Sequence, residues 1–105
     1  MNQKISVIIP IKRKESLLER VLQNIPAENE IIIVGNKHDI NESIQNSQIP
    51  AKQLFVQSKI RSELFNKGAE KAKGDIFLFL HADTILDSNV FEQIKKYLNN
   101  IKVAA

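Results

Sequence analysis

The sequence of 105 residues has the length of one domain, and its 43% hydrophobic and 26% charged residues exclude a disordered chain. The formal net charge of +3 is spread along the chain with only five Phe and one Tyr, which argues against a nucleic-acid-binding protein. Cysteine is absent, so we exclude disulfides and thiolate metal sites. No apolar run is long enough for a signal peptide or a membrane span, so we exclude transmembrane segments. We expect one cytoplasmic domain over residues 1–105.

Four apolar segments rich in β-branched residues alternate with segments of helical periodicity. In chain order we predict a strand over 5–10, a helix over 15–25, a strand over 30–35, a weakly helical polar segment over 39–48, a strand over 52–57, a helix over 60–74, a strand over 75–83 and a helix over 88–101. Apolar strands joined by helices predict a mainly parallel sheet covered on both faces, a Rossmann-like three-layer α/β/α fold.

The apolar pattern also predicts which residues face the core. The run IFLFL in the fourth predicted strand indicates the most buried strand of the sheet. The helical spacing places Leu17, Ile60 and Tyr97 on the core faces of their helices. Gly68 lowers helix stability by roughly 1 kcal/mol relative to alanine. Two explanations for this glycine are open: close packing or binding of another group beside it, and a substitution without functional consequence.

Polar side chains follow the predicted strands, where the ligands of open α/β sheets bind. The first strand leads into Lys12, Arg13 and Lys14, the third is followed by Arg61, and the fourth ends at Asp83. Cations around one carboxylate suit a phosphate-bearing ligand, with Asp83 holding a divalent metal ion between the phosphates. The alternative is that these are ordinary polar loop tips, and for the three consecutive cations alone this reading is favoured.

The two histidines have several interpretations. His81 could be a metal ligand, a hydrogen-bond donor to a phosphate or ribose, or a residue that merely ends a strand. His38 and Asp39 are interpreted as a surface loop. The sequence contains no glycine-rich phosphate loop, no dinucleotide fingerprint and no G-x-S-x-G nucleophile elbow, so a phosphate would be held by side chains and a metal ion.

The segments ISVIIPIKRKESLLERVLQNI, EIIIVG and IRSELFNKGAEKAKGDIFLFLHADTIL, with their spacing, resemble the family 2 glycosyltransferases. The most specific part runs from Arg61 through N-x-G and A-x-G-D to LHADT, in which H-A-D replaces the usual D-x-D. The resemblance extends from Ile5 to about Tyr97 and implies the nucleotide-diphospho-sugar transferase type of fold.

The resemblance implies a role for both ends of H-A-D. The second acidic residue of D-x-D binds Mn²⁺ or Mg²⁺ on the sugar-nucleotide diphosphate, and that position is Asp83 here. The first position contacts the ribose, and here it is His81, which we also count as a possible metal ligand.

The resemblance also implies a nucleotide pocket. Pro10 with the following Ile11 and Lys12 would line the base pocket, and Arg61 would approach the nucleotide. Gly35 stands where the family carries an aspartate that hydrogen-bonds the base. The family also has an N-E pair after the proline of the first strand, where this chain reads KRKE.

Complete members of the family are considerably longer, and their second half supplies the acceptor site and the catalytic base. We therefore expect a truncated fold. A natural truncation, a split gene product and a fragment of a longer chain are three alternative origins for it. Without further strands, the fourth predicted strand would lie at an unprotected sheet edge. We expect a homo-oligomer, or a partner that covers this edge.

The leading hypothesis is a glycosyltransferase-like domain that binds a nucleoside-diphosphate sugar through a divalent metal ion, for transfer to an unknown acceptor. Catalysis by this chain alone is open. The alternative is a non-catalytic binding or oligomerisation module. An aspartyl-phosphatase reading of HADT is disfavoured, because His81 cannot form the acyl phosphate.

Overall fold

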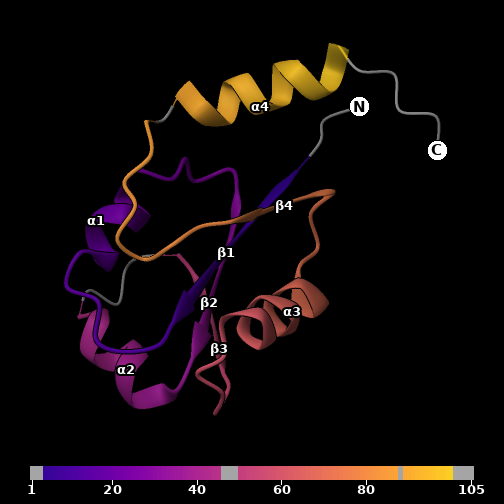
Figure 1. Cartoon of the computed structure of the whole chain (residues 1–105). Helices are drawn as coiled ribbons and strands as arrows, with labels where there is room; N and C mark the ends of the chain where they lie inside the picture. Colours follow the sequence, from indigo (N-terminus) through magenta and orange to yellow (C-terminus); the bar gives the residue numbers. More distant parts are fainter. Residues whose placement is uncertain (1–3, 46–49, 88, 101–105) are drawn as a thin grey trace.

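The central strands form where β-branched apolar residues predominate, and helices form between the strands (Figure 1). The computed structural model describes residues 4–45, 50–87 and 89–100. In chain order the elements are β1 (Ile5–Ile11), α1 (Leu18–Gln23), β2 (Glu30–Gly35), α2 (Lys37–Ser43), β3 (Lys52–Phe55), α3 (Arg61–Lys71), β4 (Ile76–Phe79) and α4 (Asn89–Asn100). This alternation confirms the predicted α/β class.

The four strands pair in parallel, in the order β3-β2-β1-β4. The chain proceeds outward from β1 to β2 and β3, and α3 then carries it back so that β4 pairs with the other side of β1. Ile8 of β1 is therefore opposite Ile32 of β2 and Phe79 of β4. The order reverses between β1 and β4, and such a switch point leaves a crevice at the carboxyl ends of the two strands.

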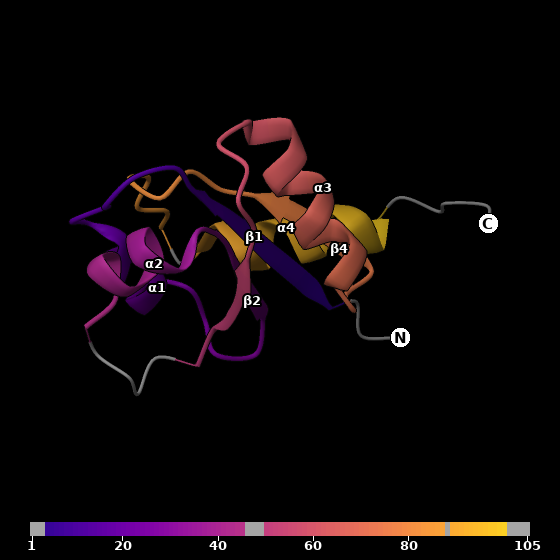
Figure 2. The same cartoon turned by 90° about the horizontal axis from the view of Figure 1, so that it is seen from below.

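The helices cover the two faces of this sheet, with α3 on one side and α1 and α2 on the other (Figures 1 and 2). Alternate strand residues enter two apolar clusters, as expected from the period of two in a strand. The larger cluster receives Leu18 of α1, Ile40 of α2 and Phe91 of α4. Leu64 of α3 lies in the smaller cluster, opposite. The three-layer Rossmann-like prediction is confirmed.

Gly68 is explained by close packing of α3 on the sheet. A Cβ atom at this position would lie 2.5 Å from Cγ2 of Ile8 and 3.0 Å from Cγ2 of Val34. Both partners are buried side chains of the central strands. The glycine therefore lets α3 approach β1 and β2 more closely than any residue with a side chain would allow.

The fourth strand is not the most buried one, so that prediction was wrong. β1 and β2 are buried along their whole length, whereas β4 alternates between half-buried and exposed residues. Phe77 and Phe79 are 45% and 48% exposed. The reason is position: β4 ends the sheet and pairs with β1 alone among the described residues. Regular pairing also stops at Phe79, short of the predicted end at residue 83.

Several helix predictions also need correction. Leu17 and Ile60 are 39% and 57% exposed, because they precede the first helical residues of α1 and α3 and do not follow the helical face. α4 buries Phe91, whereas Tyr97, farther along the helix, is 66% exposed. α2 begins at Lys37, before the predicted start, and residues 46–48, 88 and 101 of the predicted helices lie outside the described residues. Within the described ranges, no helix combines the length and apolar character needed to cross a membrane.

A buried carboxylate ties the strands together at their amino ends. Glu30 Oε1 accepts hydrogen bonds from Ser6 Oγ at 2.6 Å and the Lys73 amide at 2.8 Å, and Oε2 accepts one from Lys52 Nζ at 2.7 Å. The Gly74 amide donates to Ser6 Oγ at 2.8 Å. Burial raises the pKa of Glu30, but the hydrogen bonds and the Lys52 charge outweigh it and lower the pKa to about 2. This network lies at the opposite end of the sheet from the crevice.

Candidate functional site

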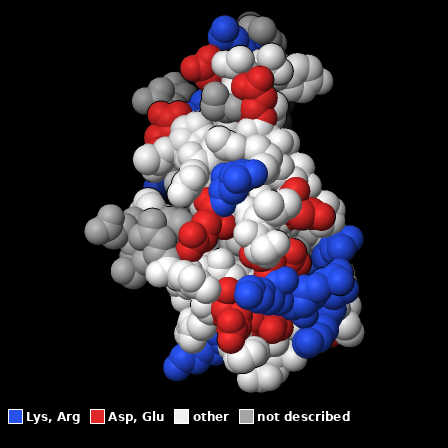
Figure 3. Space-filling view, turned by 90° about the vertical axis from the view of Figure 1, so that its left-hand side faces the viewer, with Lys and Arg blue, Asp and Glu red and all other residues white. Residues whose placement is uncertain are grey.

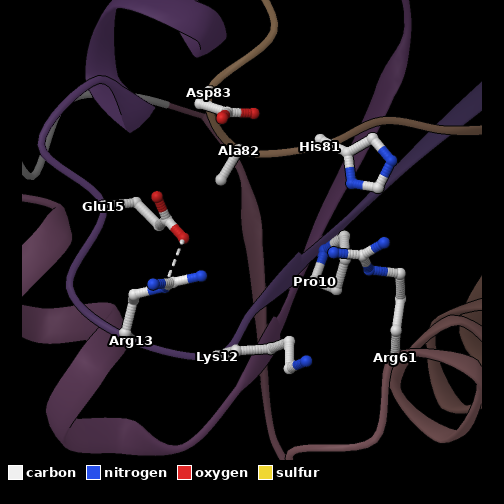
Figure 4. A pocket seen from close by; sticks show the side chains of 8 residues that line it. All are labelled: Pro10, Lys12, Arg13, Glu15, Arg61, His81, Ala82 and Asp83. Carbon is white, nitrogen blue, oxygen red and sulfur yellow. Dashed lines mark ion pairs between the residues drawn. The ribbon is translucent and has the colours of Figure 1, made fainter.

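The carboxyl ends of β1 and β4 form one side of a pocket of about 330 Å³ (Figure 4). Its walls come from three segments that are distant in sequence: the β1–α1 loop, the first residue of α3 and the turn after β4. The lining residues are Pro10, Lys12, Arg13, Glu15, Arg61, His81, Ala82 and Asp83. The switch point of the sheet is thus occupied by polar and charged side chains.

The structure brings five of the sequence-predicted site residues to this pocket: Pro10, Lys12, Arg61, His81 and Asp83. Two others do not line it. The Ile11 side chain is 1% exposed and lies in the larger apolar cluster. Gly35 pairs with Ile11 at the end of β2, and a Cβ atom there would lie 2.4 Å from the Ile11 carbonyl oxygen. No side chain fits at position 35 without a backbone shift, so a carboxylate at this end of β2 is sterically excluded.

The turn after β4 presents H-A-D to the pocket. Leu80 still donates its amide hydrogen to the Ile8 carbonyl at 3.0 Å, which anchors the end of β4 on β1. The chain then turns, and the Thr84 amide donates to the His81 carbonyl at 3.1 Å. Ala82 is buried, whereas His81 and Asp83 are exposed. A buried alanine between two exposed polar residues fixes the turn and leaves both side chains facing solvent.

Cations outnumber carboxylates in the pocket. Lys12, Arg13 and Arg61 carry positive charge, against Glu15 and Asp83. Figure 3 shows Lys and Arg side chains gathered into one cluster on this side of the molecule, with Asp and Glu beside it. The Arg13 side chain is 82% exposed, and its Nε lies 4.0 Å from Glu15 Oε2. The excess of cations favours an anionic ligand in this pocket.

Glu15 was missed as a pocket residue. The β1–α1 loop holds it through its backbone: the Glu15 amide donates to Ser43 Oγ at 2.8 Å, and Ser43 Oγ donates to the Asp39 carbonyl at 2.7 Å. Ser43 is buried, so α2 acts as a fixed support for the loop. The acidic residue that ends the tetrapeptide KRKE was the signal in the sequence, because it is the first carboxylate after β1.

The interpretation of His38 and Asp39 as a surface loop was wrong, since both lie in the first turn of α2. Asn36 caps this helix: its Oδ1 accepts from the Asp39 amide at 2.7 Å, and its Nδ2 donates to Asp39 Oδ2 at 2.7 Å. Asp39 is therefore engaged in capping and does not line the pocket.

The donor set decides what kind of metal site is possible. Across the parts of the chain that the structure describes, no three His, Asp or Glu side chains group closely enough to hold a metal ion by themselves. Mg²⁺ is usually bound through one or two carboxylates together with substrate phosphates. Asp83, with His81 nearby, fits a divalent ion held jointly with a phosphate ligand and does not fit one held by the protein alone.

A comparison with known families bears on this pocket. The family model described as "Glycosyl transferase family 2" matches residues 6–105. No curated protein matches the chain. The matched region contains β4, all of β1 except Ile5, and every residue that lines the pocket. The resemblance noted in the sequence is confirmed.

Proposed function

The chain belongs to glycosyl transferase family 2, and from this premise we propose that it binds a nucleoside-diphosphate sugar for transfer of the sugar to an acceptor. One observation carries the proposal: the switch-point pocket joins Lys12 and Arg61 to the H-A-D turn that ends in Asp83. A diphosphate is the ligand group that needs both cations and a metal-binding carboxylate.

Each of these residues has a distinct task in the proposed site. Lys12 and Arg61 bind and orient the diphosphate oxygens from two separate segments, because one follows β1 and the other begins α3. Asp83, assisted by His81, would hold Mn²⁺ or Mg²⁺ against the same diphosphate. When bound, such an ion neutralises the charge that develops on the leaving nucleoside diphosphate. Pro10 forms the floor of the pocket between these groups.

The titration that tests this proposal uses the intact chain with UDP-, GDP- and dTDP-sugars, with and without Mn²⁺, followed by calorimetry. We expect binding of at least one sugar nucleotide that tightens when Mn²⁺ is present. Asp83→Asn should remove the metal-dependent gain, because an amide is a poor ligand for a hard divalent ion.

The matched control is Asp87→Asn, in the same loop, where the side-chain oxygen accepts from the Asn89 amide at 3.0 Å. An asparagine oxygen can make the same bond, so this variant should bind like the wild type. Absence of binding by every sugar nucleotide, or unchanged metal dependence in Asp83→Asn, would overturn the proposal.

The free edge of β4 favours a second candidate, a non-catalytic binding or oligomerisation module. This edge carries exposed aromatic side chains, as expected for a surface that another chain covers. Self-association without any response to sugar nucleotides would support the module. We propose a second chain at this edge in either case. The cytoplasmic location stays a prediction.

A further inference from the structure

Glu15 is a pocket carboxylate that the proposed site leaves without a task. It lines the same pocket as the cations, but a carboxylate repels the phosphate oxygens that those cations attract. Its side chain is 24% exposed, and Nε of Arg13 lies 4.0 Å from its Oε2, which is too far for a hydrogen bond. The carboxylate therefore retains the capacity to accept hydrogen bonds from a ligand.

The backbone of Glu15 is held in place from outside the pocket. Its amide donates to Ser43 Oγ at 2.8 Å, and Ser43 is a buried residue of α2. The loop that carries Glu15 is thus tied to a helix. A fixed backbone limits the positions that the carboxylate can reach, as is required of a residue that discriminates between ligands.

The position of Glu15 in the pocket indicates which part of a ligand it meets. Figure 4 shows Glu15 across the pocket from Arg61 and His81. A ligand whose diphosphate is bound on the Arg61 side leaves the Glu15 side to its uncharged part. Two other carboxylates at this end of the sheet have different roles, since Asp83 is the proposed metal ligand and Asp39 accepts from Asn36 Nδ2 in the cap of α2.

Two kinds of chemical group present neighbouring donors that match the two oxygens of one carboxylate. Vicinal hydroxyls of a ribose or hexose ring are the first kind, and the ring N–H and amino group of guanine are the second. Both belong to the uncharged parts of sugar nucleotides. We propose that Glu15 is a specificity-determining residue that accepts hydrogen bonds from such a donor pair. This inference rests on the proposed binding of a sugar nucleotide and adds the residue that recognises the ligand beyond its phosphates.

This role makes the pocket discriminate against a bare diphosphate. Pyrophosphate is repelled by Glu15 and offers it no donor pair. A ligand that carries the donor pair gains charge-assisted hydrogen bonds to the same carboxylate. Specificity is such a difference of affinities, and a site built to bind a hydroxyl or N–H group rejects an analogue that lacks it.

Calorimetry of the intact chain with Mn²⁺ and a series of ligands tests this role: pyrophosphate, UDP, GDP and UDP-glucose. Glu15→Gln should bind pyrophosphate at least as tightly as the wild type does, because the repulsion is removed. Ligands that carry the donor pair should bind about tenfold more weakly, because a charge-assisted hydrogen bond is lost. A loss that begins with UDP identifies ribose as the donor, one confined to GDP identifies guanine, and one confined to UDP-glucose identifies the hexose.

Two further variants separate the hydrogen bonds from the charge. Glu15→Asp keeps the charge but shortens the side chain, so it should leave pyrophosphate binding unchanged and still weaken the ligands that Glu15→Gln weakens. Both substitutions keep the amide that donates to Ser43, and circular dichroism checks that the fold is retained. Glu42→Gln is the matched control, because the Glu42 side chain is 48% exposed on α2 and does not line the pocket. This variant should bind every ligand like the wild type.

The direction of the two effects decides the outcome. Weaker binding of pyrophosphate and nucleotides alike by Glu15→Gln would overturn the inference, because Glu15 would then act as a metal ligand or a structural residue. Tighter binding of both would also overturn it, because Glu15 would then act by repulsion alone. Nucleotide binding that Glu15→Gln leaves unchanged would overturn the inference and leave the proposed function intact. Absence of nucleotide binding by the wild type would overturn the proposed function, and the inference with it.

Discussion

Glu30 offers the most direct test of how this sheet is held together. Its buried carboxylate accepts from Ser6, Lys52 and the Lys73 amide, and these interactions lower its pKa from 4.5 to about 2. Each unit of pKa difference between the folded and unfolded chains is worth about 1.4 kcal/mol. The ionised carboxylate therefore contributes about 3 kcal/mol to the free energy of unfolding at neutral pH. Glu30→Gln should lower that free energy by roughly 2–3 kcal/mol, since an amide keeps part of the hydrogen bonding.

The sign of the pH dependence follows from the lowered pKa. The stabilisation is complete above the unfolded pKa of about 4.5 and is lost as the pH falls toward the folded pKa of about 2. Urea unfolding followed by circular dichroism should therefore show the wild type approaching Glu30→Gln as the pH is lowered. The difference between them should shrink to about 1 kcal/mol near pH 3.

The control for this measurement is Glu28→Gln, in the loop that leads into β2. Glu28 forms a 3.4 Å ion pair with Lys95, but its side chain is 64% exposed. Exposed pairs contribute little, so this variant should change the free energy of unfolding by less than about 0.5 kcal/mol. Equal effects of the two substitutions, or a Glu30→Gln difference that does not change with pH, would refute the assignment of Glu30 as a buried structural anion.

Two further substitutions test the packing of α3 and the support of the pocket loop. Gly68→Ala should destabilise the fold by about 1–3 kcal/mol in urea unfolding, because a Cβ 2.5 Å from Ile8 Cγ2 overpacks the core by more than the gain in helix propensity; a stabilised variant would contradict the close approach. Ser43→Ala removes the acceptor of the Glu15 amide, so it should lower the free energy of unfolding by about 1 kcal/mol and weaken sugar-nucleotide binding in calorimetry. Ser62→Ala, on the exposed side of α3, is the control and should change neither the stability nor the binding. Unaltered binding by Ser43→Ala would show that the loop does not need α2.

The order and type of the elements could be predicted because each depends on local pattern. β1 and β2 are rich in β-branched apolar residues, and the helix between them repeats apolar residues at helical spacing. Burial could not be predicted in the same way. IFLF is as apolar as the central strands, yet Phe77 and Phe79 are about half exposed, because β4 lies at the edge of the described sheet. The contact of Phe79 with Phe65 of α3, with ring centroids 4.6 Å apart, covers it only in part. Strand order depends on which strands pair with each other, and the residues of a single strand do not indicate its position in the sheet.

The candidate site, too, could be predicted only in part. The rule that ligands bind beyond the carboxyl ends of parallel strands correctly united Lys12, Arg61 and Asp83. It also suggested the residues after β2, but only β1 and β4 flank the switch point, and that fact required the strand order. Asp39 could have been removed from the candidates by sequence alone. Asn36 followed three residues later by an acidic residue is a helix-capping pattern, and the structure uses both side chains for that purpose.

The position of the pocket beside an open sheet edge links the proposed sugar-nucleotide site physically to the proposed second chain. His81 follows directly from the strand whose outer backbone groups are free, so whatever pairs with β4 lies within reach of the pocket. Within the described residues, the H-A-D turn is held by the hydrogen bond of the Leu80 amide to β1 and by the buried Ala82, and neither lies on the outer edge of β4. A strand paired on the outer side would restrict the same turn from both sides. Binding of a sugar nucleotide should therefore be tighter when a second chain pairs with β4 than when this edge is open. If the second chain is another copy, affinity measured as a function of chain concentration distinguishes a coupled site from an independent one.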